Sequence, residues 1–406
     1  MPRNTAFFMH QRAVQIVQQR RGDGAASGPP FSFTDPTFGG NVLAIIDDGA
    51  GGKFVGGGWT SVTCNVTSTT YTTGYTRLVH LLPTGEVDAA WSCPVASGEV
   101  GALALDVANG VLYVGGSFAA IGGESRLDLA AVTASTGVVD TGWTCDTDGI
   151  VRALSVDAAN DVLYVGGSFA TIGGVSRADL AAVTASTGVV DAAWTCDTAS
   201  GEVRALALDV ANDVLYVGGN FSAIGGVFSR YAAAITASTG VVVSGWLGTV
   251  SSGTIVYALA LDVANDRLYV GGDFLAIGGG SKVDLAALTA STGAAVSGFT
   301  CNTASGNVIA LAVDSSADRL YVGGNFTNLG GASPAKVNLA AATASTGVVD
   351  AAWQCDAGGT VRALQIDPAN DALFVGGSFN GATGLDGEQR DRFGTVVAST
   401  GDLFVP

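Results

Sequence analysis

A phrase of the form L-Y-V-G-G-x-F recurs seven times in this chain of 406 residues. It reads KFVGGGW at 53–59, LYVGGSF at 112–118 and 163–169, LYVGGNF at 215–221 and 320–326, LYVGGDF at 268–274, and LFVGGSF at 373–379. Its first glycine falls at 56, 115, 166, 218, 271, 323 and 376, at intervals of 51 to 59 residues. A period near 50 residues with several short strands per unit is typical of β-propeller blades.

Each repeat contains four short segments with the alternation and β-branched residues of strands. The first reads VRALALD at 203–209, the second is the glycine phrase, the third reads DLAAVTASTG at 179–188, and the fourth reads VVDAAW at 189–194. Strict alternation predicts a large face and a small face in the first segment, which are Arg204, Leu206 and Leu208 against Val203, Ala205 and Ala207. The glycine pair permits close backbone approach or a bulge.

The ends of the repeat region predict how it closes. Asp35 and Phe38 match the D-x-x-W pattern of the fourth segment, seen at Asp191 and Trp194, and this pattern is missing after Gly401. We therefore expect residues 31–38 to complete the last repeat, which removes exposed sheet edges. The predicted fold is all-β: a seven-bladed β-propeller of four-stranded blades over residues 31–406, closed by the N-terminal strand and preceded by a short arm.

The glycine phrases, the D-x-x-W pattern and the V-x-A-L-A-L-D segment together resemble the delta-60-type β-propeller repeat. That family occurs in bacterial and bacteriophage proteins and has no single assigned activity. The resemblance covers nearly all of residues 31–406 and implies a fold more than a function, since one fold hosts many functions. The chain departs from the pattern by often placing Cys two residues after the Trp.

Charge and hydropathy exclude several partners. The formal net charge is −17, which disfavours nucleic acid because phosphate neutralisation needs basic residues. No apolar run approaches the roughly 20 residues that a membrane-spanning helix needs, so no membrane span is expected. The N-terminus also lacks the continuous apolar stretch of a secretory signal peptide.

Few residues suggest catalysis. The two histidines, His10 and His80, form no recognisable nucleophile and base pattern and are interpreted as incidental, so we expect no enzyme activity and no cofactor. An acid ends each first segment, and we favour turn capping over a calcium site for Asp47, Asp106, Asp157, Asp209, Asp262, Asp314 and Asp367. Five cysteines at one repeat position are expected to be buried thiols, with disulfides or a soft metal as alternatives: Cys93, Cys145, Cys196, Cys301 and Cys355.

Three regions vary between repeats and are candidates for recognition. The second position of the first segment holds Arg152, Arg204 and Arg362 in three repeats, facing either a channel or the next blade. The stretch 60–76 is rich in Thr and Tyr, and 380–393 holds the densest charge cluster. Loops that depart from a rigid scaffold often carry recognition. The candidate residues in these two loops are Tyr71, Tyr75, Asp386, Glu388, Arg390 and Arg392.

Residues 1–30 do not belong to the repeat. Asn4 can cap a helix over about residues 5–21, and GDGAASGPP at 22–30 has the composition of a linker. We expect this arm to dock on another protein, with folding back onto its own propeller as the alternative. The anchor candidates are Phe7, Phe8, Met9, Val14, Ile16 and Val17.

These features favour a non-enzymatic structural or binding subunit of a larger assembly. The favoured case is a bacteriophage virion protein of the tail or receptor-binding type, whose arm binds other proteins of the assembly. Its propeller loops would contact a host-surface receptor or glycan. The alternatives are an adhesin on the bacterial cell surface or secreted outside the cell, and an enzyme with a site at the propeller axis.

Overall fold

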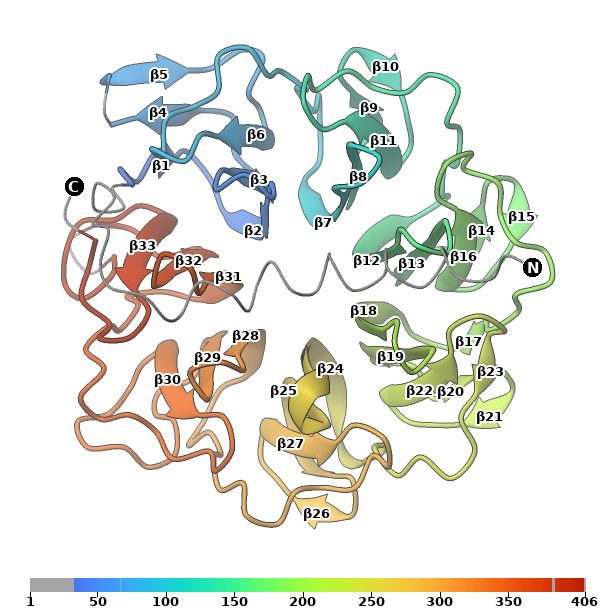
Figure 1. Ribbon diagram of the computed structural model, residues 1–406, viewed down its shortest axis with the longest axis vertical. Coiled ribbons are helices and arrows are strands. Elements are labelled where there is room, and N and C mark those ends of the chain that lie inside the picture. Colours follow the sequence, from blue (N-terminus) through green and yellow to red (C-terminus); the bar gives the residue numbers. More distant parts are fainter. Residues whose placement is uncertain (1–32, 66, 382–383, 405–406) are drawn as a thin grey trace, which may run out of the picture. The chain divides into compact units, whose positions relative to one another are not determined.

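The computed structural model describes residues 33–65, 67–381 and 384–404. Within these ranges the chain is all-β apart from one 3₁₀ turn, η1 (Val263–Asn265). Its strands form many small antiparallel sheets, an arrangement compatible with the predicted propeller (Figure 1). The predicted arm and its six anchor residues lie outside the described ranges.

Each glycine phrase lies in the middle strand of its own sheet, between a strand from the first segment and one from the third. The first-segment strands are β2 (Val42–Asp47), β7 (Val100–Asp106), β12 (Ile150–Asp157), β18 (Val203–Asp209), β24 (Val250–Asp262), β28 (Val308–Asp314) and β31 (Val361–Asp367). The middle strands are β3 (Lys53–Gly57), β8 (Val111–Gly116), β13 (Val162–Ser168), β19 (Val214–Gly219), β25 (Arg267–Ile277), β29 (Arg319–Gly324) and β32 (Ala372–Gly377). The third strands are β6 (Leu78–Leu81), β11 (Leu129–Thr133), β16 (Leu180–Thr184), β22 (Ala232–Thr236), β27 (Leu285–Thr289), β30 (Leu339–Thr343) and β33 (Phe393–Val397).

Successive sheets pack face to face through a glycine and a valine. A Cβ atom on Gly218 would lie 2.6 Å from Val256 Cγ1 of the next first-segment strand, closer than side-chain atoms approach. Gly376 of β32 faces Val42 of β2 in the same way, and β31 contacts β2. Glycine is therefore needed here for close packing. The other pairs are Gly56–Val100, Gly115–Val151, Gly166–Val203, Gly271–Val308 and Gly323–Val361.

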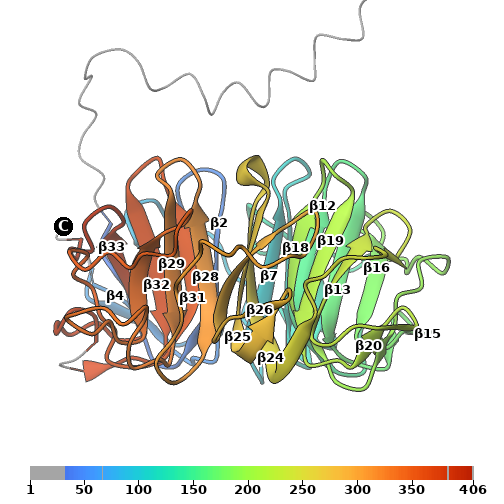
Figure 2. The ribbon, with the colours of Figure 1, turned by 90° about the horizontal axis from the view of Figure 1, so that it is seen from below.

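Aromatic donors join the same neighbours by hydrogen bonds. The Ala185 carbonyl oxygen accepts 2.9 Å from the Tyr113 hydroxyl and 2.8 Å from Trp143 Nε1, both of the preceding repeat. Buried tyrosine and tryptophan normally need such partners for their polar atoms. The same pattern joins Tyr164 and Trp194 to Ala237, and Tyr321 and Trp353 to Ala398. Figure 2 shows the strands of neighbouring sheets standing side by side.

The acids that end the first segments cap turns, as predicted. Asp209 Oδ1 accepts 3.1 Å from the Asn212 backbone N–H, and Asp209 Oδ2 accepts 2.8 Å from Asn212 Nδ2. The same two bonds form in the pairs Asp106–Asn109, Asp157–Asn160, Asp262–Asn265 and Asp367–Asn370. Asp314 and Asp47 instead accept from the backbone N–H groups of Ser316 and Gly49.

The fourth segment differs from the prediction of a full strand. It forms a strand only at β23 (Val241–Val242), which pairs with β22, while elsewhere in the described chain it makes single bridges such as Val132 with Val139. In the last sheet this bridge joins Val396 to Leu403, near the C-terminus. The expectation that residues 31–38 supply this pairing is therefore wrong, because the Asp402 carbonyl and the Phe404 N–H already bond to β33.

The N-terminal strand pairs elsewhere. β1 (Thr37–Phe38) joins β4 (Val62–Cys64), which in turn pairs with β5 (Thr69–Tyr71). Short outer strands follow the glycine phrases in other repeats, and their turns contain glycine pairs such as Gly173 and Gly174, with φ of 55° and 74°. These strands are β9 (Ala120–Ile121), β10 (Glu124–Ser125), β14 (Thr171–Ile172), β15 (Val175–Ser176), β20 (Ala223–Ile224), β21 (Val227–Phe228) and β26 (Gly280–Ser281). A further short strand, β17 (Thr198–Ala199), precedes β18 and pairs with β20.

Candidate functional site

A β-bulge interrupts every first-segment strand at the second position of the V-x-A-L-A-L-D segment. In β18 the register shifts between Val203 and Ala205, so that these residues pair with Gly219 and Gly218 and Arg204 is the extra residue. The same shift occurs in β2, β7, β12, β24, β28 and β31. The predicted strict alternation is therefore wrong at this point. A bulge re-aims a side chain, and here it frees the second position from the sheet faces.

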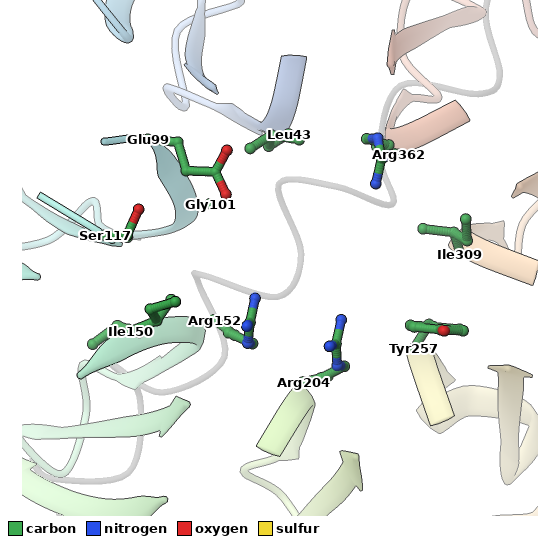
Figure 3. Close-up of a pocket in the computed structure, with 12 residues that line it drawn as sticks. Leu43, Glu99, Gly101, Ser117, Ile150, Arg152, Arg204, Tyr257, Ile309 and Arg362 are labelled. Carbon is green, nitrogen blue, oxygen red and sulfur yellow. The ribbon is translucent and has the colours of Figure 1, made fainter. Parts of the chain in front are cut away.

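The bulge residues of all these strands line one central cavity of about 200 Å³. They are Leu43, Gly101, Arg152, Arg204, Tyr257, Ile309 and Arg362, joined by Glu99, Ser117 and Ile150 (Figure 3). The three arginines therefore face a shared space, one of the two orientations expected from the sequence. Because each repeat contributes one residue, the cavity is polar on one part of its wall and apolar on another.

Glu202 holds two of the arginines together. Its side chain is 11% exposed, and Arg152 Nε donates to Oε2 at 2.5 Å while Arg204 Nε donates to Oε1 at 2.6 Å. Arg204 Nη2 also contacts Oε1, and the Arg204 guanidinium lies 5.4 Å from the Tyr257 ring centroid. Charge-assisted bonds of this kind fix the orientation of both guanidinium planes. Glu202 was not predicted as a site residue from the sequence, although it directly precedes the first segment, as Glu99 does in an earlier repeat.

Arg362 differs from the other two arginines. Its side chain is exposed and has no ion-pair or hydrogen-bond partner within the described ranges. In Figure 3 its nitrogen atoms point into the cavity, as do those of Arg152 and Arg204. Glu99, also exposed, lines the cavity, and Glu202 adds a second carboxylate that is bonded to Arg152 and Arg204. Three arginines against two glutamates leave a local excess of positive charge in a chain whose net charge is −17.

An apolar ring lies next to the arginines. A second cavity shares Leu43, Gly101 and the three arginines with the first and continues along the first-segment strands. The fourth position of each segment contributes a branched apolar side chain to its wall, namely Ile45, Leu103, Leu154, Leu206, Leu259, Leu311 and Leu364. The site thus combines guanidinium donors with an apolar floor, a combination typical of small-molecule sites.

Two of the predicted recognition residues contact the protein's own N-terminal segment. Arg390 Nε lies 3.1 Å from Asp35 Oδ2, an ion pair without hydrogen-bond geometry, and Arg392 Nη1 donates to the Phe38 carbonyl at 3.0 Å. Arg126 occupies the position equivalent to Arg390 in an earlier repeat, and it donates to the Asp140 and Thr141 carbonyls. The geometry therefore gives both arginines a structural contact.

Asp35 and Phe38, the predicted closure residues, contact the last sheet through their side chains. Asp35 Oδ1 accepts from Thr395 Oγ1 of β33, and the Phe38 ring lies 5.6 Å from the Phe393 ring and 4.5 Å from that of Trp59. Phe38 is fully buried. Side-chain contacts thus form where the sequence predicted backbone pairing.

The other recognition candidates lie in two places. Tyr71 and Tyr75 pack edge to face with ring centroids 4.9 Å apart, and the Tyr75 hydroxyl donates to the Ala89 carbonyl at 3.2 Å. Asp386 and Glu388 lie in a tight turn that is closed by a hydrogen bond from the Glu388 N–H to the Leu385 carbonyl. Their role in recognition stays a prediction.

The five equivalent cysteines are buried free thiols, which matches the preferred interpretation. Burial raises the pKa of Cys93 and Cys301 to about 12, and burial together with a neighbouring aspartate does the same for Cys145 and Cys196. Within the described ranges no group of three or more His, Cys, Asp or Glu side chains is placed to hold a metal ion. No helix there has the length and apolar character needed to cross a membrane.

Comparison of the chain with known protein families and with curated proteins finds no match.

Proposed function

We propose that residues 33–404 form a closed seven-bladed β-propeller. Seven equivalent glycine–valine contacts support the proposal, because the last of them joins Gly376 to Val42 and so links the end of the repeat region to its beginning. The contacts of Asp35 and Phe38 with β33 support the same closure. A closed ring leaves no sheet edge exposed between the first and last repeats.

This propeller serves as a non-enzymatic binding subunit of a larger assembly, in the favoured case a bacteriophage virion protein of the tail or receptor-binding type. The observation that carries the proposal is a contrast between repeats. Turn aspartates, aromatic donors and glycine–valine pairs recur and are used within the fold. The loops 60–76 and 380–393 differ from the other repeats, and differences on a rigid scaffold are suited to recognition.

Residues 1–30 supply the attachment to the assembly in this proposal. The apolar residues Phe7, Phe8 and Met9 give the segment side chains that a partner protein would cover. Tyr71 and Tyr75 are the receptor-contacting candidates, because tyrosine supplies a large, amphipathic contact surface with few rotatable bonds.

Mass spectrometry of purified phage particles from cells encoding the chain tests this proposal. We expect the chain in the particles, its loss when Phe7, Phe8 and Met9 are all replaced by Asp, and its retention when Tyr71 and Tyr75 are replaced by Ala. The tyrosine variant should instead reduce attachment of the particles to host cells. A chain found only on the bacterial surface or in the medium would favour the adhesin alternative, and a chain found only free in the cell would contradict both.

A further inference from the structure

We propose that the central cavity binds a small organic anion, whose carboxylate or phosphate group is held by Arg362 together with Arg152 and Arg204. This inference is independent of the assembly function, since it concerns residues that neither the loops nor the arm contribute. It rests on the placement of the three side chains, on the donors left unused and on the apolar wall beside them.

The arginines of the cavity have unused hydrogen-bond donors. A guanidinium group offers five N–H donors in a fixed plane, and Arg152 donates one of them, at Nε, to Glu202. Arg362 donates none to any described residue. These remaining donors point toward the middle of the cavity (Figure 3). Planar, bidentate donors of this type match the oxygen atoms of carboxylate and phosphate groups.

Charge comes second. Glu202 carries one negative charge against the two arginines that it bonds, and Glu99, which also lines the cavity, adds a second negative charge that is exposed to solvent. Arg362 lies on β31, whereas the two glutamates directly precede β7 and β18, and its charge has no bonded partner among the described residues. An anion in the cavity would pair with it, and low-dielectric walls would strengthen that attraction.

Size and apolar contacts set the ligand class. About 200 Å³ accommodates a small molecule and excludes a folded protein or a nucleic-acid duplex. Tyr257 and Ile309 lie on the same wall as Arg362, and the ring of leucines follows. The ligand is therefore expected to carry an apolar or aromatic part beside its anionic group.

The test is calorimetric titration of the full chain, at low ionic strength, with phenylacetate and in parallel with phenyl phosphate, which join an aromatic ring to a carboxylate or a phosphate group. We expect at least one of them to bind, and Arg362→Gln to weaken that binding about tenfold or more because a charge-assisted contact is lost. Arg230→Gln is the matched control, since Arg230 is an exposed arginine outside the cavity whose guanidinium lies over Phe228. It should leave the affinity unchanged. Preference for phenylacetate would identify a carboxylate ligand, and preference for phenyl phosphate would identify a phosphate ester.

Two further variants separate the site from general charge effects. Glu99→Gln should tighten binding, because it removes a negative charge from the rim. Gly101→Tyr should abolish binding by filling the space, since a Cβ there meets no atom within 4 Å and Tyr257 occupies the equivalent position of another repeat. Thermal melting confirms that each variant is folded. The proposal is overturned if neither anion binds up to about 10 mM, or if binding persists unchanged in both Arg362→Gln and Gly101→Tyr.

Discussion

Asp35 Oδ1 accepts a hydrogen bond of 2.7 Å from Thr395 Oγ1, a residue 360 positions further along the chain. Both side chains are buried, and Phe33 packs edge to face on Phe374 beside them with ring centroids 5.0 Å apart. Bringing such distant segments together carries a loop-closure cost in chain entropy that contacts within one repeat do not. The proposed closure therefore depends on a small cluster of side chains that no single repeat contains.

The charge of Asp35 makes this cluster sensitive to pH. Burial raises the pKa of Asp35 to about 6, although the hydrogen bond from Thr395 and the charge of Arg390 act to lower it. Because the folded pKa exceeds the unfolded value of 3.8, the folded protein holds the proton more tightly. The contribution of this group to stability is therefore greatest below about pH 4 and is lost as the pH rises through about 6.

Asp35→Asn removes this titration. The unfolding free energy of the variant, minus that of the natural chain, should increase by about 2–3 kcal/mol between about pH 4 and pH 7. Urea unfolding of both proteins at a series of pH values measures this difference in unfolding free energy. The titration of the other acids is common to both proteins and drops out of the difference. Parallel curves for the two proteins would show that Asp35 does not titrate in the buried position that the structure gives it.

Closure can also be tested by packing. Gly376→Ala places a Cβ against Val42 and should destabilise the protein by about 1–3 kcal/mol, the usual effect of overpacking. Val42→Ala in the same chain should relieve part of this strain, with a coupling energy of about 1 kcal/mol. The matched control is the pair Gly218 and Val256, which lies within the run of repeats. If the first and last repeats do not meet, Gly376→Ala will be neutral while Gly218→Ala remains destabilising.

The sequence predicts local features better than those that depend on neighbouring strands. The turn role of Asp209 follows from local chemistry, because Asn212 lies three residues away and offers both donors. The close approach of Val256 to Gly218 agrees with the prediction made from the glycine pair, because a glycine has no side chain to prevent it. The bulge at Arg204 could not be predicted in this way. Alternation along one strand does not show that the partner strand has no residue opposite Arg204, because Val203 and Ala205 pair with the adjacent Gly219 and Gly218.

The central site depends on that missed bulge. Arg152, Arg204 and Arg362 share a repeat position, so their equivalence is visible in the sequence, but their common direction is set by strand register. Glu202 pairs with arginines of two different repeats, and nothing in its local sequence identifies the Arg152 contact. The outer pairing of Leu403 with Val396 was missed because no D-x-x-W pattern accompanies it.

The buried cysteines give a chemical prediction. A thiol with its pKa raised to about 12 has almost no thiolate near neutral pH, and the thiolate is the reactive form. We expect Cys93, Cys145, Cys196 and Cys301 to resist iodoacetamide in the folded protein and to react fully in denaturant. Peptide mapping by mass spectrometry reads each site separately. Rapid labelling of any of these four sites in the folded protein would contradict its burial.

His80 lies between two aspartates and gives the stability a second pH dependence. Its pKa is raised by neighbouring carboxylates, whereas that of Asp35 is raised by burial. Its Nδ1 lies 2.9 Å from Asp88 Oδ2 and its Nε2 lies 3.0 Å from Asp48 Oδ2, with the ring stacked on Phe54. Burial alone would lower the pKa of His80, but the hydrogen bonds and charges of the two carboxylates outweigh it and raise the pKa. His80, interpreted from the sequence as incidental, therefore has specific contacts in the structure with Asp48, Asp88 and Phe54.

The protonated imidazole is stabilised by folding, so its contribution is fully present below the unfolded pKa of about 6.5 and is lost as the pH rises through the folded value. His80→Gln should therefore cost more stability at about pH 6 than at about pH 9. Because the chain has only two histidines, NMR titration of their ring protons measures the pKa directly, and His10→Gln assigns the remaining signal to His80. A His80 signal that titrates at or below about 6.5 would show that burial outweighs the two carboxylates.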